Sequence, residues 1–137
     1  MQDSPDLRNI INSWFDAAAK GDAGWRDHHV SQVSGLRIVG TDPDELLQGA
    51  RAYEFLKDEA AMIGGRVAIE VKDVEAFEEG SVGWGLALPE ITLAGGLKVS
   101  PRWSAVFHKE GVDWKLVQLH ASLAQANEAA FGDTFAP

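Results

Sequence analysis

A histidine and a hydroxyl, His120 and Ser122, end the stretch Trp114–Ser122 near the C-terminal end of the sequence. In a strand, alternation places both side chains on the face of Trp114, which makes that face polar at one end. An imidazole titrates near neutral pH and can act as a hydrogen-bonding group or a general base. The pattern predicts His120 at the floor of a partly polar cavity, as the candidate catalytic residue. The alternative is a structural histidine bonded to a neighbouring strand or to the first helix.

Arg102 is the strongest charged candidate for ligand binding. It shares strand parity with Ser100 and Ser104. If that parity points inward, its planar guanidinium can clamp a carboxylate or a phenolate. The alternative is a surface arginine paired with Glu70 or Glu90.

The chain has five tryptophans, of which Trp25 and Trp84 are the best pocket candidates. Trp25 lies on a short second helix, and Trp84 stands between Gly83 and Gly85. Flanking glycines leave room beside an indole for a flat apolar ligand. They can equally serve to let the strand bend. Together these patterns predict a ligand pocket lined by Trp25, His28, Trp84, Arg102, His120 and Ser122.

Metal and cofactor chemistry have no support in the sequence. His28 and His29 are adjacent, so they point in different directions on a helix, and no His-x-x-x-His spacing occurs. No helix is expected after the glycines at 80, 83 and 85, which therefore do not form a dinucleotide fingerprint. The chain has no cysteine, which excludes disulfides and thiolate chemistry. We expect no metal and no cofactor.

Length and charge favour a single domain over residues 1–137. The net charge of −9 argues against nucleic acid and against an anionic membrane surface as partners. The N-terminal residues lack the basic and apolar regions of a signal peptide, and no apolar run approaches a membrane span. The expected localisation is cytoplasmic.

Helix signals precede strand signals along the chain. Ser4-Pro5 starts a helix that ends at Gly21, a short helix follows near 23–28, and another lies between Gly49 and Gly64. Period-two patterns then predict strands at 66–78, 81–91, 98–109 and 113–124, with turns at Gly80, Gly95-Gly96 and Gly111. This order predicts an α+β fold with N-terminal helices packed on a strongly curved antiparallel β-sheet.

Several predicted strands are apolar on both faces. Val99, Trp103 and Phe107 oppose Val106 within the third long strand. One face covers the helices, and a second copy of the chain is the economical cover for the other, since contiguous apolar patches mark interfaces. We therefore expect a homodimer; scattered exposed apolar residues on a monomer are the alternative.

Three stretches resemble one superfamily. Trp114-x-x-Val117-x-x-His120-x-Ser122 resembles the final strand of the SnoaL-like and nuclear transport factor 2-like superfamily. The stretches 40–45 and 127–132 look like segments of a subgroup of small, uncharacterised bacterial SnoaL-like proteins. The resemblance implies a cone-shaped sheet with cystatin-like topology, and homodimers across the outer sheet face are common in such proteins.

Two classes of function follow. The first is a homodimer that binds a small hydrophobic or aromatic acidic ligand in the pocket of the cone. The second, which the resemblance implies, is a cofactor-independent isomerase, dehydratase or cyclase acting on a polyketide- or steroid-like substrate. The tyrosine of the isomerases is missing from the first helix, where Trp14 and Phe15 stand. Whether the chain is an enzyme therefore stays open.

Overall fold

The computed structural model describes residues 1–135. Four helices and a short 3-10 segment are present: α1 (Pro5–Lys20), α2 (Gly24–His29), α3 (Gly49–Ile63), α4 (Asn127–Phe131) and η1 (Gly132–Phe135). The strands are β1 (Gln2–Asp3), β2 (Arg37–Val39), β3 (Leu46–Gln48), β4 (Val67–Glu79), β5 (Val82–Leu93), β6 (Lys98–Val99), β7 (Arg102–Glu110) and β8 (Asp113–Ser122).

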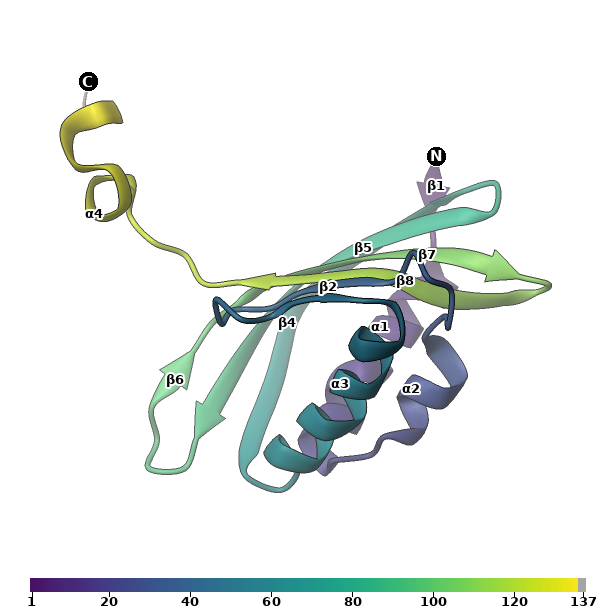
Figure 1. Cartoon of the computed structure of the whole chain (residues 1–137), viewed down its shortest axis with the longest axis horizontal. Helices are drawn as coiled ribbons and strands as arrows, with labels where there is room; N and C mark the ends of the chain where they lie inside the picture. Colours follow the sequence, from purple (N-terminus) through teal and green to yellow (C-terminus); the bar gives the residue numbers. More distant parts are fainter. Residues whose placement is uncertain (136–137) are drawn as a thin grey trace.

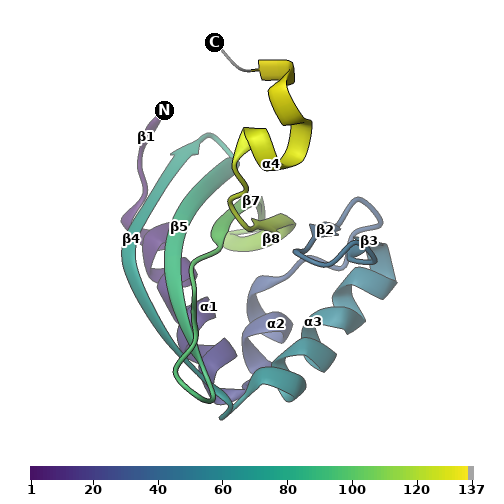
Figure 2. The same cartoon turned by 90° about the vertical axis from the view of Figure 1, so that its left-hand side faces the viewer.

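The strands form one curved sheet in the order β1-β4-β5-β7-β8-β2-β3, with β6 paired to β5. All pairs are antiparallel except β2 with β8, which are parallel. The sheet bends around α1, α2 and α3 and stays open on one side (Figure 2). The predicted α+β fold with a curved antiparallel sheet is confirmed, as are turns at the predicted glycines.

Local signals place α1 as predicted. The Ser4 hydroxyl accepts a hydrogen bond from the Leu7 N–H, and Pro5 occupies the first helical position. Gly21 ends the helix in the left-handed conformation at φ 73°. The inner stripe of α1 then buries Leu7, Ile11 and Phe15 against the sheet.

The chain leaves the body after β8. Residues 123–126 and the short helix α4 extend away from the sheet and the other helices (Figure 1). The stretch 127–132, which contributed to the family resemblance, therefore forms a helix outside the sheet-and-helix body. The pairing of β2 with β3 was also not predicted from the sequence.

Two β-bulges decide which side chains face the helices. Gln118 pairs with Val106 while Leu116 pairs with Phe107, so Val117 is an extra residue in β8. Lys72 is a second extra residue, in β4. Each bulge reverses the facing of the residues beyond it.

The prediction that His120 and Ser122 share a face with Trp114 is therefore wrong. Trp114, Leu116 and Leu119 are buried, whereas Gln118 and His120 are exposed. The inner face of β8 continues from Leu116 to Leu119 because Val117 shifts the alternation.

The glycines beside Trp84 make room for α1. A Cβ at Gly85 would lie 2.2 Å from Ile11 Cδ1 and 3.1 Å from the carbonyl oxygen of Glu75. A Cβ at Gly83 would lie 2.2 Å from Leu7 Cδ1. The space beside these glycines is thus filled by side chains of α1, so it is not available to a ligand.

Gly85→Ala is expected to destabilise the fold. The added methyl group must displace Ile11 and press on a backbone oxygen, and overpacking of this kind costs about 1–3 kcal/mol. Urea unfolding followed by tryptophan fluorescence measures the loss. Gly35→Ala is the control, because a Cβ there meets nothing within 4 Å. Equal stability of the two variants would contradict the close packing of α1 on β5.

Candidate functional site

A cavity of ≈ 170 Å³ lies between α1, α3 and the inner face of the sheet. The turn between β2 and β3 and residues at the ends of β7 and β8 contribute to its lining. The lining is mostly apolar and comprises Trp14, Phe15, Ala18, Ile38, Val39, Gly40, Thr41, Glu45, Phe55, Glu59, Ile63, Ile69, Pro89, Ile91, Pro101, Trp103, Leu119 and Ala121. A mostly apolar cavity with a few polar groups is the usual form of a small-molecule site.

Aromatic rings form a continuous wall of this cavity. The ring centroids of Trp14 and Trp103 are 6.1 Å apart, and those of Phe15 and Trp103 are 5.3 Å apart. Phe55 of α3 adds a further ring to the lining. The rings of Phe15 and Trp103 meet edge-on, whereas those of Trp14 and Trp103 are tilted against each other.

Glu59 of α3 is the most unusual polar group in the lining. Burial, and secondarily the neighbouring Glu45 carboxylate, raise its pKa from the usual 4.5 to about 7. Within residues 1–135, its carboxyl group has no hydrogen-bond or ion-pair partner. A carboxyl group with a near-neutral pKa can hold or release a proton at physiological pH.

Glu45 supplies the second carboxylate. Its Oε1 accepts a hydrogen bond of 3.1 Å from the Asp42 N–H, and the Glu45 N–H donates to the Asp42 carbonyl at 2.9 Å. These two hydrogen bonds close the turn between β2 and β3. This turn fixes the Glu45 carboxylate at the cavity.

Trp103 contributes a buried donor next to the cavity. Its side chain is buried at 4% exposure, and its Nε1–H has no hydrogen-bond partner among the described residues. The Nε1 atom is itself fully buried, so the cavity contacts the ring of Trp103 and not its N–H. An unpaired buried donor of this kind destabilises the folded chain.

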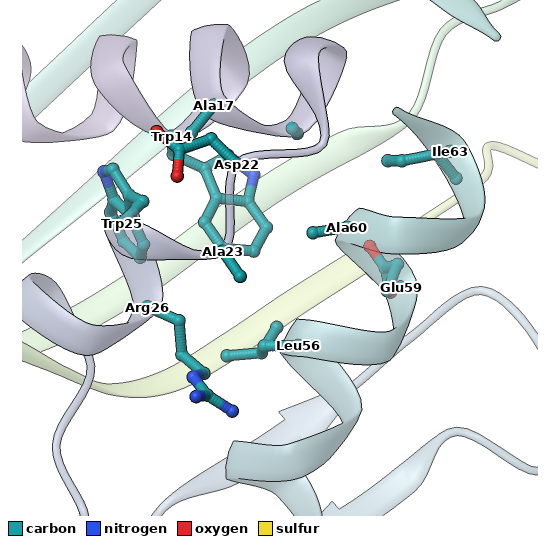
Figure 3. A pocket seen from close by; sticks show the side chains of 11 residues that line it. Trp14, Ala17, Asp22, Ala23, Trp25, Arg26, Leu56, Glu59, Ala60 and Ile63 are labelled. Carbon is teal, nitrogen blue, oxygen red and sulfur yellow. The ribbon is translucent and has the colours of Figure 1, made fainter. Parts of the chain in front are cut away.

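A smaller gap lies between α1, α2 and α3 (Figure 3). It measures ≈ 20 Å³, and Trp14, Trp25, Arg26 and Glu59 help to line it. The Trp25 indole packs edge-on against Trp14 with centroids 4.8 Å apart, and its Nε1–H donates to Ser13 Oγ at 2.8 Å. Trp25 is thus part of the buried packing between helices.

Arg26 is held within this helix layer. Its guanidinium donates to Asp27 Oδ1 at 2.8 Å and to the Tyr53 carbonyl at 3.2 Å. It also lies 4.2 Å from the centre of the Tyr53 ring. These partners fix the guanidinium beside α2 and the start of α3.

The predicted site residues do not line one cavity. Arg102 pairs with Ser122, and His120 pairs with Ser104, so these side chains come together on the outer face of the sheet. Trp84 lies on that face too, in a shallow groove with Phe77, Leu86 and Val106. His28 lies in an open groove between α2 and the β7–β8 turn. Of the predicted set, Trp25 alone lines the small gap between α1, α2 and α3.

Sequence reasoning missed Glu59, Glu45 and Trp103. A signal for Glu59 was present, because Phe55 and Ile63 lie four residues before and after it on the apolar stripe of α3. A charged residue on such a stripe is either a structural ion pair or part of a site.

Two features are absent from residues 1–135. No three His, Asp or Glu side chains are grouped so as to hold a metal ion. No helix combines the length and the apolar composition needed to span a membrane.

Solved structures share this architecture. An NTF2-like protein of unknown function from Pseudomonas putida superposes with a TM-score of 0.76 at 13% identity, over 90% of this chain and 88% of that chain. A Streptomyces avermitilis protein of the NTF2-like family, provisionally named a dehydratase, gives 0.70 at 19% identity, over 88% and 94%. The association domain of Caenorhabditis elegans CaMKII gives 0.66 at 16%, over 85% and 92%. At these identities the likeness concerns the fold, which is NTF2-like.

The family model of the SnoaL-like domain matches residues 7–126. The chain therefore belongs to the family of SnoaL-like domains, as the resemblance implied. No curated protein matches the sequence significantly.

Proposed function

We propose that this SnoaL-like domain binds a small, largely apolar molecule in the cavity between α1, α3 and the sheet. The observation that carries the proposal is a mostly apolar cavity in whose lining the Glu59 carboxyl group has no hydrogen-bond or ion-pair partner among the described residues. Among residues 1–135, no lysine, arginine or histidine lines the cavity. For that reason the proposed ligand is not an acid, although the sequence suggested one.

The cavity volume limits the ligand. A cavity of ≈ 170 Å³ is similar to apolar cavities of about 150 Å³ that bind benzene. One ring with a short substituent fits inside. A polycyclic ligand would exceed this volume.

A fragment screen tests binding. Single-ring fragments are expected to shift the NMR signal of the Trp103 indole N–H, assigned by comparison with Trp103→Phe. Ala121→Phe fills the cavity and should remove these shifts, because Ala121 lines it. Ala124→Phe, at an exposed position beyond β8, is the control and should leave them intact. Equal shifts in both variants would contradict binding in this cavity.

A proton-transfer enzyme is the second candidate. Its support is the near-neutral pKa of Glu59, since an acid–base catalyst works best with a pKa near the operating pH. Solved neighbours include proteins provisionally named a dehydratase and a ketosteroid isomerase. Deuterium incorporation next to the carbonyl of single-ring ketones in D₂O tests this candidate. Exchange should be lost in Glu59→Gln.

We further propose that a second copy of the chain covers the outer sheet face. Apolar side chains cluster at its centre, and three of them are about two-fifths exposed: Val82 at 43%, Leu86 at 41% and Leu88 at 42%. Trp84 and Phe77 stack beside them with ring centroids 6.4 Å apart. An exposed apolar patch of this kind suits a partner surface.

The charges on this face suit a copy of itself. Exposed carboxylates on β4 (Glu70, Asp73 and Glu75) lie on one side of the apolar centre, and Arg102 of β7 lies on the other. A two-fold axis running along the strands would place the acidic side of one copy against Arg102 of its partner. An isologous interface requires this kind of self-complementarity.

A further inference from the structure

We infer that the cavity selects a ligand carrying a protonated amine, whose ammonium group pairs with Glu59 and Glu45 while its ring lies against Trp14, Phe15 and Trp103. The inference rests on the proposed function, because it names the chemical class of the ligand in that same cavity.

The charges of the side chains that line the cavity favour a cationic ligand. Two carboxylates face the cavity, and no cationic side chain in residues 1–135 lines it. Arg26, the cation of the neighbouring helix layer, is already paired with Asp27. Above pH 7, where Glu59 is ionised, a bound cation would meet two carboxylates that no cationic side chain of the described lining neutralises. A neutral ligand would leave both charges uncompensated, and an anion would add a third negative charge.

The aromatic wall of the cavity also favours a cationic ligand. Rings of Trp14, Phe15 and Trp103 adjoin one another. Tryptophan faces attract cations, and aromatic enclosures with acidic groups are a known means of recognising ammonium ions. The same rings pack well on the apolar part of a ring-bearing amine.

The charge of the whole chain agrees with a cationic ligand. A net charge of −9 attracts cations to the protein and repels anions from it.

Binding is expected to depend on pH. The ammonium group pairs with the ionised form of Glu59, whose pKa is about 7, so affinity should rise from pH 6 to pH 8. An alkylamine stays protonated over this range, as a lysine does. The other ionisable groups of the cavity and of the adjacent helix layer are Glu45, Asp22 and the paired Arg26.

The experiment compares three probes of one shape: phenethylamine, 2-phenylethanol and phenylacetate. Each is titrated into the full chain, with the Trp103 indole signal as the readout. At pH 8 the amine is expected to bind about tenfold tighter than the alcohol, as a charge-assisted hydrogen bond provides, and phenylacetate should bind most weakly. Glu59→Gln should remove the preference for the amine and its pH dependence. Asp58→Asn, which neutralises an exposed carboxylate on the same helix, should keep both.

The outcomes separate this inference from the proposed function. If the alcohol binds as well as the amine, or if Glu59→Gln keeps the preference, the inference is wrong and binding of an apolar ligand stands. If none of the three probes shifts the Trp103 signal while Trp103→Phe identifies it, both the inference and the proposed function are overturned.

Discussion

Glu59→Gln is expected to raise the free energy of unfolding at pH 8 by on the order of 3 kcal/mol. The magnitude follows from a pKa raised from 4.5 to about 7, at about 1.4 kcal/mol for each unit. Glutamine keeps the shape of the side chain and removes its charge. The substitution thus separates the cost of an ionised carboxyl group in the cavity from the packing of α3.

The direction of the pH dependence follows from proton linkage. The folded chain holds a proton on Glu59 up to about pH 7, whereas the unfolded chain releases it near 4.5. Between these values the folded state binds more protons, so the contribution of Glu59 to stability falls as pH rises and stays low above pH 7. Glu59→Gln should have little effect at pH 4 and its full effect at pH 8.

Urea unfolding at pH 4, 6 and 8, at one protein concentration, measures this difference. Asp58→Asn is the matched control, since it removes one negative charge from an exposed position on the same helix. A gain in Glu59→Gln that is independent of pH, or equal to that of Asp58→Asn, would contradict the raised pKa. It would also weaken both functions proposed for the cavity.

Leu86→Glu is expected to convert a dimer into a folded monomer. Leu86 lies on β5 at the centre of the outer apolar face and is 41% exposed in the single chain. A carboxylate there stays hydrated in the monomer, but it would be buried without a partner in a face-to-face dimer. Such burial costs several kcal/mol.

Sedimentation velocity at micromolar concentration gives the oligomeric state. Leu97→Glu is the control, because Leu97 is 66% exposed in the hairpin before β6, away from the apolar centre. This variant should remain dimeric. Circular dichroism should show both variants folded. A monomeric wild type, or a dimeric Leu86→Glu variant, would contradict the interface.

Short-range signals predicted the elements of this fold well. The Ser4 cap, Pro5 and Gly21 bound α1 through contacts made within a few residues. The turns at Gly80 and Gly111 likewise use left-handed glycines, at φ 61° and 67°. Such rules act locally, so they can be read from one sequence without the rest of the structure.

The side of the sheet on which each side chain lies was predicted less well, because it depends on the pairing register along a whole strand. In β7, which contains no extra residue, strict alternation correctly placed Arg102 and Trp103 on opposite faces, but Arg102 was assigned to the inner face, which Trp103 occupies. In β8 it failed after Leu116, where Val117 is inserted, and it placed His120 on the wrong face. Nothing in the residue type of Val117 marks it as a bulge.

The candidate site depends on contacts between distant segments. Glu59 on α3 and Glu45 in the β2–β3 turn affect each other because the fold brings these segments to one cavity. The apolar neighbours of Glu59 were visible in the sequence, but the proximity of Glu45 was not. The unpaired state of the Trp103 N–H likewise depends on everything packed around it.

The extra residue at Val117 also has an evolutionary consequence. A deletion of this single codon would leave Leu119 and Ala121 facing the helices and Gln118 and His120 facing outward, because the remaining residues of β8 would then alternate without interruption. A deletion at a regularly paired position of β8 would instead shift the residues beyond it to the opposite face, and so exchange side chains between the cavity and the outer surface. In a lineage with this sheet, the position of an insertion or deletion therefore decides whether the pocket chemistry is kept or replaced in one mutational step.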